Sequence, residues 1–166
     1  MDIIELRKLE EKFHRQALEC IRRSVEISNS PDYPSSIIDY QLHTHYTMDW
    51  IKEKMQSRYF IVALIDNQVV GTGSLDDNEI KAVFVDPDYQ RRGIGQAIME
   101  ELERYGKSKG LQEIKLNASI TAFEFYKKLQ YHLVKEIAEK YQDDTAITYL
   151  MKKRLSSYTM GKQIIS

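Results

Sequence analysis

A glycine-rich loop with two arginines follows a short apolar run near the middle of the chain. Residues 79–85 read Glu-Ile-Lys-Ala-Val-Phe-Val, which is typical of a β-strand, and the turn-forming residues 86–88 end it. The loop at 90–95 reads Gln-Arg-Arg-Gly-Ile-Gly, and apolar residues then recur at helical spacing from Ile94 to Tyr105. The loop is therefore predicted at the N-terminus of a helix. Free backbone amides and the helix dipole favour an anion there, so the pattern predicts phosphate binding.

The residues of this loop fit phosphate binding, but they also allow other interpretations. Gly93 and Gly95 let backbone approach a phosphate without an intervening side chain, while Arg91 and Arg92 add positive charge. A tight strand-to-helix turn that binds nothing would also contain a Gly-x-Gly pair. A generic nucleotide site is disfavoured, because the loop has neither the Lys-Ser/Thr ending of a P-loop nor the full Gly-x-Gly-x-x-Gly spacing.

The rest of the pattern predicts a sheet with helices around it. Strand-like runs occupy residues 1–7, 59–65, 69–75, 79–85, 111–116, 131–138 and 146–153. Apolar residues recur at helical spacing in 9–25, after Thr47, from Ile94 onward and in part of 117–129. Thr47 and Ser119 are the expected N-caps of the second and the last of these helices. The segment 26–40 is instead rich in turn-forming residues. The strand, helix and strand across 79–116 imply a right-handed crossover between parallel strands. The predicted fold class is α/β (α+β), a mixed, mostly antiparallel sheet of about six to seven strands with about four helices.

Two glycines lie inside the strand predicted at 69–75. Glycine weakens a strand interior, so Gly71 and Gly73 need a structural reason. A close approach by another group, a bulge and a tight crossing of packed elements each supply one.

Composition favours one domain and argues against several classes of function. The 166 residues are 42% hydrophobic and 30% charged, so we expect one domain at 1–155 with a C-terminal tail at 156–166. The net charge of −1 shows no excess of positive charge that would favour non-specific nucleic-acid binding. No apolar run approaches the roughly 18 residues of a membrane span, so we expect no membrane association and a cytoplasmic location.

Metal binding and cysteine chemistry find little support. Cys20 is the only cysteine, which excludes an intramolecular disulfide or a cysteine-based metal cluster. It falls on the apolar side of a predicted helix, where packing is favoured over a nucleophilic role. His43 and His45 could form half a metal site, but no further ligand stands at a diagnostic spacing, so no metal is expected.

Two segments together resemble the GNAT N-acetyltransferase superfamily. Residues 85–95, with a Val-x-Pro strand end and Gln-x-x-Gly-x-Gly, match its acetyl-coenzyme A signature. Residues 118–126 match a second motif, with Ala-Ser, then Ala, then Phe-Tyr. The chain departs from the family at 129–131, where Leu-Gln-Tyr replaces Leu-Gly-Phe, and this change implies a different helix end. The resemblance extends over 59–153, whereas the first 58 residues match only in layout.

The resemblance implies acetyl-coenzyme A as the cosubstrate, with no metal. Loop amides at Arg92, Gly93, Gly95 and Gln96 would hold the pyrophosphate, and the preceding strand would pair with the pantetheine arm. The residues implied in coenzyme binding are Phe84, Val85, Gln90, Arg91, Arg92, Gly93, Ile94, Gly95, Gln96 and Asn117.

The resemblance also implies a reaction, in which acetyl passes from the coenzyme to a primary amine by direct attack in a ternary complex. The tyrosine matching Tyr126 serves as general acid in the family, and a phenol of pKa about 10 can protonate a thiolate. Glu79 lies at the offset of the catalytic glutamate of the histone-acetyltransferase branch. The alternatives are an apolar-face aromatic for Tyr126 and an exposed strand-start carboxylate for Glu79.

The acceptor and the partners stay open on the sequence. Aromatic and imidazole side chains gather where the family builds its acceptor side, although for any single one of them ordinary packing is the favoured interpretation: Tyr40, His43, His45, Tyr46 and Trp50. A small-molecule amine is slightly favoured over a protein acceptor, and a homodimer would be unsurprising. The alternative function is a non-catalytic acyl-coenzyme A sensor or interaction module, which needs the phosphate loop but not Tyr126.

Overall fold

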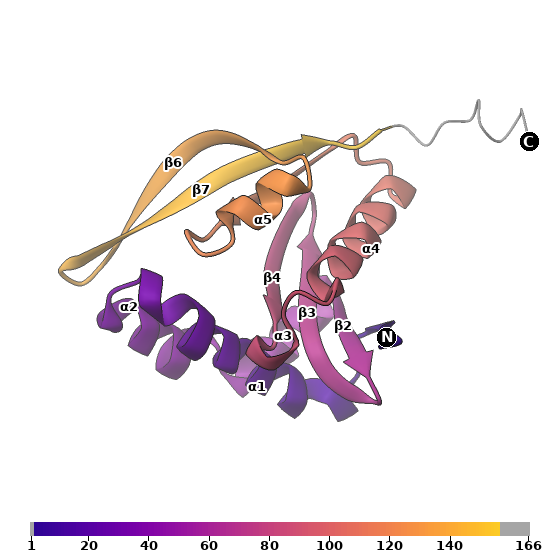
Figure 1. Ribbon diagram of the computed structural model, residues 1–166, viewed down its shortest axis with the longest axis horizontal. Coiled ribbons are helices and arrows are strands. Elements are labelled where there is room, and N and C mark those ends of the chain that lie inside the picture. The colour runs from indigo at the N-terminus through magenta and orange to yellow at the C-terminus, as the bar shows by residue number, and fades with distance from the viewer. Residues whose placement is uncertain (1, 157–166) are drawn as a thin grey trace, which may run out of the picture.

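The computed structural model describes residues 2–156 and contains a seven-stranded sheet with the strand order β1-β2-β3-β4-β5-β7-β6 (Figure 1). The strands are β1 (Glu5–Lys8), β2 (Tyr59–Ile65), β3 (Gln68–Asp76), β4 (Glu79–Val85), β5 (Glu113–Ala118), β6 (His132–Tyr141) and β7 (Asp144–Arg154). Every neighbouring pair is antiparallel except β4 and β5, which are parallel. This topology confirms the predicted mixed, mostly antiparallel sheet with one crossover.

Five α-helices and several short helical segments surround the sheet. The α-helices are α1 (His14–Arg23), α2 (Ser35–Tyr40), α3 (Met48–Ser57), α4 (Ile94–Ser108) and α5 (Phe123–Lys128). The short segments are η1 (Glu11–Phe13), η2 (Ser24–Asn29), η3 (Ser30–Asp32), η4 (Gln41–His45) and η5 (Pro87–Tyr89). Helices α1 and α3 lie on the side of the sheet opposite to α4 (Figure 1). The sheet is therefore the middle layer of the fold.

Strand β2 shows how the sheet is buried on both faces. Phe60, Val62 and Leu64 pack into the core beneath α1 and α3, whereas Ile61 and Ala63 pack into the core beneath α4. Successive side chains of a strand point to opposite faces, so a strand with a helix layer on each side needs apolar residues at every position. This demand explains the unbroken apolar run that identifies β2 in the sequence.

The segment predicted as turns at 26–40 is largely helical, and that prediction is wrong in part. After α1 the chain continues through η2 and η3, and α2 begins at Ser35 directly after Pro34. Ile37 and Ile38 are 1% and 6% exposed, so α2 buries an apolar side despite its turn-forming composition. Proline and serine are common at helix starts, which is the ambiguity that misleads the sequence reading.

Helix caps and element ends agree with the sequence to different degrees. The Thr47 hydroxyl accepts from the Trp50 amide at 3.2 Å, which confirms the predicted cap of α3. Ser119 instead accepts from the Ala122 amide at 3.1 Å within a turn, and α5 begins later, at Phe123. The first strand begins at Glu5 rather than at the N-terminus, and the final hairpin strands are longer than predicted.

Helix α4 crosses β3 at its two glycines. A Cβ on Gly71 would lie 2.8 Å from Ile98 Cδ1 and 2.9 Å from Ile94 Cγ2, and one on Gly73 would overlap Ile98 Cγ2. Of the three reasons that the sequence leaves open, the tight crossing of packed elements is therefore present at both glycines. The crossing fixes the height of α4 above the sheet.

Two sequence predictions concern the chain as a whole. The tail predicted at 156–166 lies, from 157 onward, outside the described residues, and the single domain at 1–155 stays a prediction. No helix within 2–156 combines the length and the apolar character that crossing a membrane requires.

Gly73→Ala should destabilise the fold because its methyl group has no space between β3 and α4. Overpacking a close core contact typically costs about 1–3 kcal/mol, so we expect a lower urea midpoint with an unchanged slope. Equilibrium urea unfolding followed by circular dichroism measures this. A midpoint equal to that of the wild type would contradict the tight crossing.

Candidate active site

The two parallel strands in the middle of the sheet are paired only at one end. Register pairs between β4 and β5 are Glu79 with Lys115 and Ile80 with Leu116, and none follows. Beyond this point the strands diverge, so backbone donors and acceptors on the facing edges of β4 and β5 lack ladder partners. Buried or half-buried backbone groups need partners, so an extended ligand can pair there.

A β-bulge accompanies the divergence of β4. Pairing between β3 and β4 runs from Thr72 with Phe84 to Ser74 with Lys81, so two residues of β4 stand opposite one of β3. Ala82 has a φ of 57°, and its carbonyl accepts from the buried Thr72 hydroxyl at 2.8 Å. Bulges bend a strand and increase its twist, which turns the second half of β4 away from β5.

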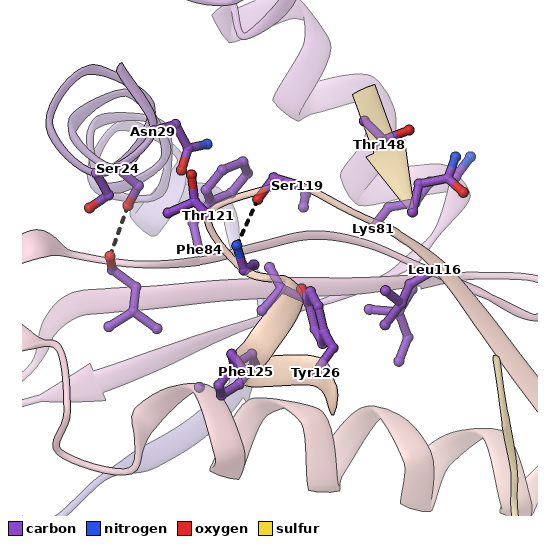
Figure 2. Close-up of a pocket in the computed structure, with 18 of the residues that line it drawn as sticks. Ser24, Asn29, Lys81, Phe84, Leu116, Ser119, Thr121, Phe125, Tyr126 and Thr148 are labelled. Atoms are coloured by element: carbon purple, nitrogen blue, oxygen red, sulfur yellow. Dashed lines mark hydrogen bonds between the residues drawn. The ribbon is translucent and has the colours of Figure 1, made fainter. Parts of the chain in front are cut away.

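A cavity of about 650 Å³ lies where the strands diverge (Figure 2). All the site residues predicted from the sequence line it, except Glu79 and Arg92. The predicted residues in the lining are Phe84, Val85, Gln90, Arg91, Gly93, Ile94, Gly95, Gln96, Asn117 and Tyr126. Segments that are distant in the sequence thus meet at one cavity, and its volume suits a ligand of substantial size.

The loop before α4 has the backbone of an anion-binding turn. Gly93 precedes the first residue of α4 with a φ of 82°, and Arg91 has a φ of 62°. Left-handed residues at a helix start turn successive amides toward one side, which makes a concave site for a phosphate. Glycine at position 95 has a packing reason as well, because a Cβ there would lie 2.9 Å from Phe125 Cζ.

Arg92 points away from the cavity. Its guanidinium pairs with Asp2 at 3.0 Å and lies 4.9 Å from the centre of the Tyr89 ring. The Arg92 side chain therefore packs on the outer surface of the loop. Coenzyme binding by the Arg92 backbone amide stays a prediction.

The wall opposite α4 includes η2, the helical segment that follows α1. The Ser24 hydroxyl lies 2.9 Å from the carbonyl oxygens of both Cys20 and Val85, and Figure 2 shows the second contact. Gln90 donates to the Ser28 hydroxyl at 3.0 Å. These bonds hold the start of the loop against the helical layer.

Tyr126 lies in the cavity wall and is held in its protonated form. Its side chain is 7% exposed, and burial raises the pKa of its phenol above the ordinary value. The backbone around it is fixed by bonds from its amide to Ala122 and from the Tyr131 amide to its carbonyl. A buried phenol keeps its proton at neutral pH and can donate a hydrogen bond, and its raised pKa also makes it a weaker acid than an exposed tyrosine.

Glu79 lies at the start of β4, outside the cavity lining. It is half-buried and stands opposite Asp76 on β3 and Lys115 on β5. The structure thus separates the two residues that the sequence predicts as catalytic, with Tyr126 in the cavity wall and Glu79 at the closed end of the strand pair. Its role as a base stays a prediction.

Of the early aromatic and imidazole residues, Tyr46 lines the cavity. It packs edge-on against Phe84, Trp50 and His45, with ring centres 5.6, 5.0 and 4.5 Å apart. Burial raises the pKa of Tyr46. Tyr40, His43, His45 and Trp50 are not in the lining. Trp50 packs against Tyr46 and Phe60, whereas Tyr40, His43 and His45 are exposed, and a role of these four on the acceptor side stays a prediction.

The structure adds cavity residues that the sequence reading misses. Tyr33 accepts from the Ile120 amide at 2.9 Å and ties the segment after η3 to the loop before α5. The final hairpin contributes Glu139, Tyr141 and Thr148 to the same lining. No local motif marks these residues, because they reach the cavity only through the register of β6 on β7.

Other candidate chemistry is limited in the described part of the chain. Burial raises the pKa of the Cys20 thiol to about 12, so its reactive thiolate is disfavoured. Within residues 2–156 no three His, Cys, Asp or Glu side chains gather as metal ligands would.

Comparison with known proteins assigns the family. The family model described as "Acetyltransferase (GNAT) domain" matches residues 30–155. The chain therefore belongs to the GNAT acetyltransferase family. It is 36% identical over 85 residues to the uncharacterized N-acetyltransferase YafP of Escherichia coli (strain K12), a match that covers 51% of this chain and 53% of YafP. The chain thus spans about half the length of this relative.

Two solved structures share the fold. A GCN5-related N-acetyltransferase from Rhodopseudomonas palustris has a TM-score of 0.87 at 20% identity, covering 93% of this chain and 98% of its own. The PaiA N-acetyltransferase from Thermoplasma acidophilum, solved in complex with coenzyme A, has a TM-score of 0.77 at 21% identity, covering 92% and 99%. At these identities the likeness establishes the GNAT fold.

Tyr126 should remain a phenol well above the pH at which exposed tyrosines ionise. Burial favours the neutral phenol in the folded protein. The contribution of this group to the free energy of unfolding is therefore fully present below about pH 10, the pKa of an exposed tyrosine, and is lost as the pH rises through the higher pKa of the folded state. Subtracting the phenolate absorbance titration of Tyr126→Phe from that of the wild type isolates this group. A component with a midpoint at or below about pH 10 would contradict the buried phenol.

Proposed function

We propose that this protein is an N-acetyltransferase that moves acetyl from acetyl-coenzyme A to a primary amine by direct attack in a ternary complex. The observation that carries the proposal is the single cavity at which the diverging strands, the loop before α4 and the Tyr126 side chain meet. Family membership and the coenzyme A complex of the PaiA relative support the identity of the donor.

The coenzyme is proposed to lie along β4 and across the start of α4. Backbone amides at Arg92, Gly93, Gly95 and Gln96 would hold the pyrophosphate, and Phe84 and Val85 would pair with the pantetheine arm. The unpaired edge of β4 and the left-handed loop residues support this placement. Asn117 lines the cavity from β5, on the other side of the opening.

The reaction forms one bond and breaks another. The neutral amine nitrogen attacks the thioester carbonyl carbon, the new nitrogen–carbon bond forms, and the carbon–sulfur bond breaks. The attacking nitrogen loses a proton to a base or water, and the departing thiolate takes one from the Tyr126 hydroxyl. The raised pKa of Cys20 supports direct attack over an acyl-cysteine route.

Glu79 is the proposed base, with water as its link to the acceptor. An alkylammonium of pKa about 10.4 must lose a proton before it attacks. Because Glu79 lies outside the cavity lining, water has to carry that proton to the carboxylate. The acceptor itself is proposed to be a small molecule rather than a protein.

Tyr126→Phe should lower turnover by about 10²- to 10⁴-fold, the range expected for loss of a general acid. The measurement is coenzyme A release from acetyl-coenzyme A with a panel of polyamines, amino acids, aminoglycosides and lysine or N-terminal peptides. Tyr105→Phe is the matched control, because Tyr105 stacks on Tyr59 outside the cavity. Equal turnover in Tyr126→Phe and the wild type would remove Tyr126 from the mechanism.

Glu79→Gln should depress the rate most at low pH, where the fraction of neutral amine is smallest. Asp77→Asn removes the same charge from the neighbouring exposed turn, where Asp77 has a φ of 55° that asparagine tolerates. We expect the control to keep the wild-type pH–rate profile. An unaltered profile in Glu79→Gln would assign proton removal to water or another group.

The second candidate function is an acyl-coenzyme A sensor that transfers nothing. It would use the same loop and strand edge, but it would not need a protonated phenol in the cavity wall. The position of Tyr126 in the cavity lining favours the enzyme over the sensor.

A further inference from the structure

The inner face of the final hairpin places a carboxylate in the cavity. Along the second half of β6, Ile137, Glu139 and Tyr141 are half-buried while the alternate residues are exposed. The strand period of two therefore turns these three side chains toward the body of the protein. The β6–β7 hairpin reaches over α2 (Figure 1), and Ser36 of α2 hydrogen-bonds to Asp144.

Glu139 is the one acidic residue in the lining of the cavity, among the residues that the structure describes. The other charged lining residues are Lys81 and Arg91. Lys81 has a partner of its own, because its ammonium lies 3.3 Å from Asp76. None of the ion pairs found within residues 2–156 involves Glu139. The Glu139 carboxylate can therefore form an ion pair with a cation of a bound ligand.

The surroundings of Glu139 orient it and leave space beside it. The Tyr141 hydroxyl donates to Glu139 Oε2 at 2.9 Å, and burial together with this bond raises the pKa of Tyr141 to about 12. The residue opposite Glu139 on β7 is Ala146, which is 5% exposed and also lines the cavity. A methyl group at that position leaves the carboxylate accessible from within the cavity.

A second polar group nearby lacks a partner. Thr148 lines the cavity from β7, two residues from Ala146, and its buried Oγ1 has no hydrogen-bond partner among the described residues. Tyr33, Tyr46 and Tyr141 line the same region. Buried hydroxyls are rarely left unpaired, and aromatic rings attract cations, so this end of the cavity suits a polar cation.

Glu139 lies on the last hairpin, beyond the end of β5. Strand β5 ends at Ala118, which pairs with Tyr149 of β7. Glu139 pairs with Ala146, which lies three residues before Tyr149, toward the start of β7. At roughly 3.3 Å per residue, Glu139 stands about 10 Å beyond the end of β5. In Figure 2, Thr148 and Tyr126 lie on opposite sides of the pocket.

We infer that Glu139 binds a second positive charge of the acceptor, so that the substrate class is a small diamine or polyamine rather than a monoamine. This inference rests on the proposed acetyl transfer. One amine of the substrate reacts beside Tyr126, while a distant ammonium lies on the Glu139 carboxylate. Glu139 is therefore a specificity-determining residue that does not take part in proton transfer.

The test compares putrescine, cadaverine and hexamethylenediamine with butylamine, pentylamine and hexylamine as acceptors. We expect a higher kcat/KM for diamines by about 10- to 100-fold, the range of a charge-assisted hydrogen bond. Glu139→Gln should abolish this preference mainly by raising KM for diamines, with monoamines changed by less than about twofold. Glu139→Asp keeps the charge on a side chain one methylene shorter, so the preferred diamine should become longer.

The matched control is Glu136→Gln, which removes the same charge from the exposed outer face of β6. It should leave the diamine preference intact. Coenzyme binding and the unfolding midpoint of each variant check that the fold is unchanged.

Each contrary outcome has a separate meaning. Equal kcat/KM for diamines and monoamines in the wild type would overturn the inference while leaving the acetyl transfer in place. A fall in kcat for both classes in Glu139→Gln, with an altered pH profile, would assign Glu139 to proton transfer and also overturn it. Absence of coenzyme A release with every amine and peptide would reject the proposed function itself.

Discussion

The organisation of this protein depends on the incomplete pairing of β4 with β5. The two strands share register pairs only at Glu79 with Lys115 and at Ile80 with Leu116, and the bulge at Ala82 then bends β4 away. A fully paired parallel sheet would satisfy the backbone of both strands and leave no space between them. The divergence instead creates the cavity and leaves a strand edge for an extended ligand. Helix α4, seated closely on Gly71 and Gly73, places its N-terminus beside that edge.

Opposite charges mark the two ends of the cavity that results. The amides before α4 and Arg91 make one end favourable for phosphate, whereas Glu139 makes the hairpin end favourable for a cation. The lining as a whole contains aliphatic, aromatic and polar side chains, and burial keeps the Tyr126 phenol neutral. An anionic donor and a cationic acceptor would therefore enter with their charged groups kept apart.

Sequence predicts this structure where the determinants are local. The loop at 90–95 is local because a turn, a glycine and a helix start are encoded within a few residues, and β2 is marked by its unbroken apolar run. Features that depend on distant packing are not predicted: α2 looks like a series of turns until Ile37 and Ile38 are seen to be buried. Glu139 is hidden for the same reason, because only the register of the last hairpin decides which side chains of β6 face the cavity.

Ligand-induced stabilisation of the whole protein tests whether the divergent strands and the loop before α4 form a coenzyme A site. At about 100 times its dissociation constant a ligand adds roughly 2.7 kcal/mol to the unfolding free energy, which raises the melting temperature by several degrees. We expect this shift with acetyl-coenzyme A and none with ATP or NAD at the same concentration. A shift with ATP or NAD but not with acetyl-coenzyme A would contradict the coenzyme A site.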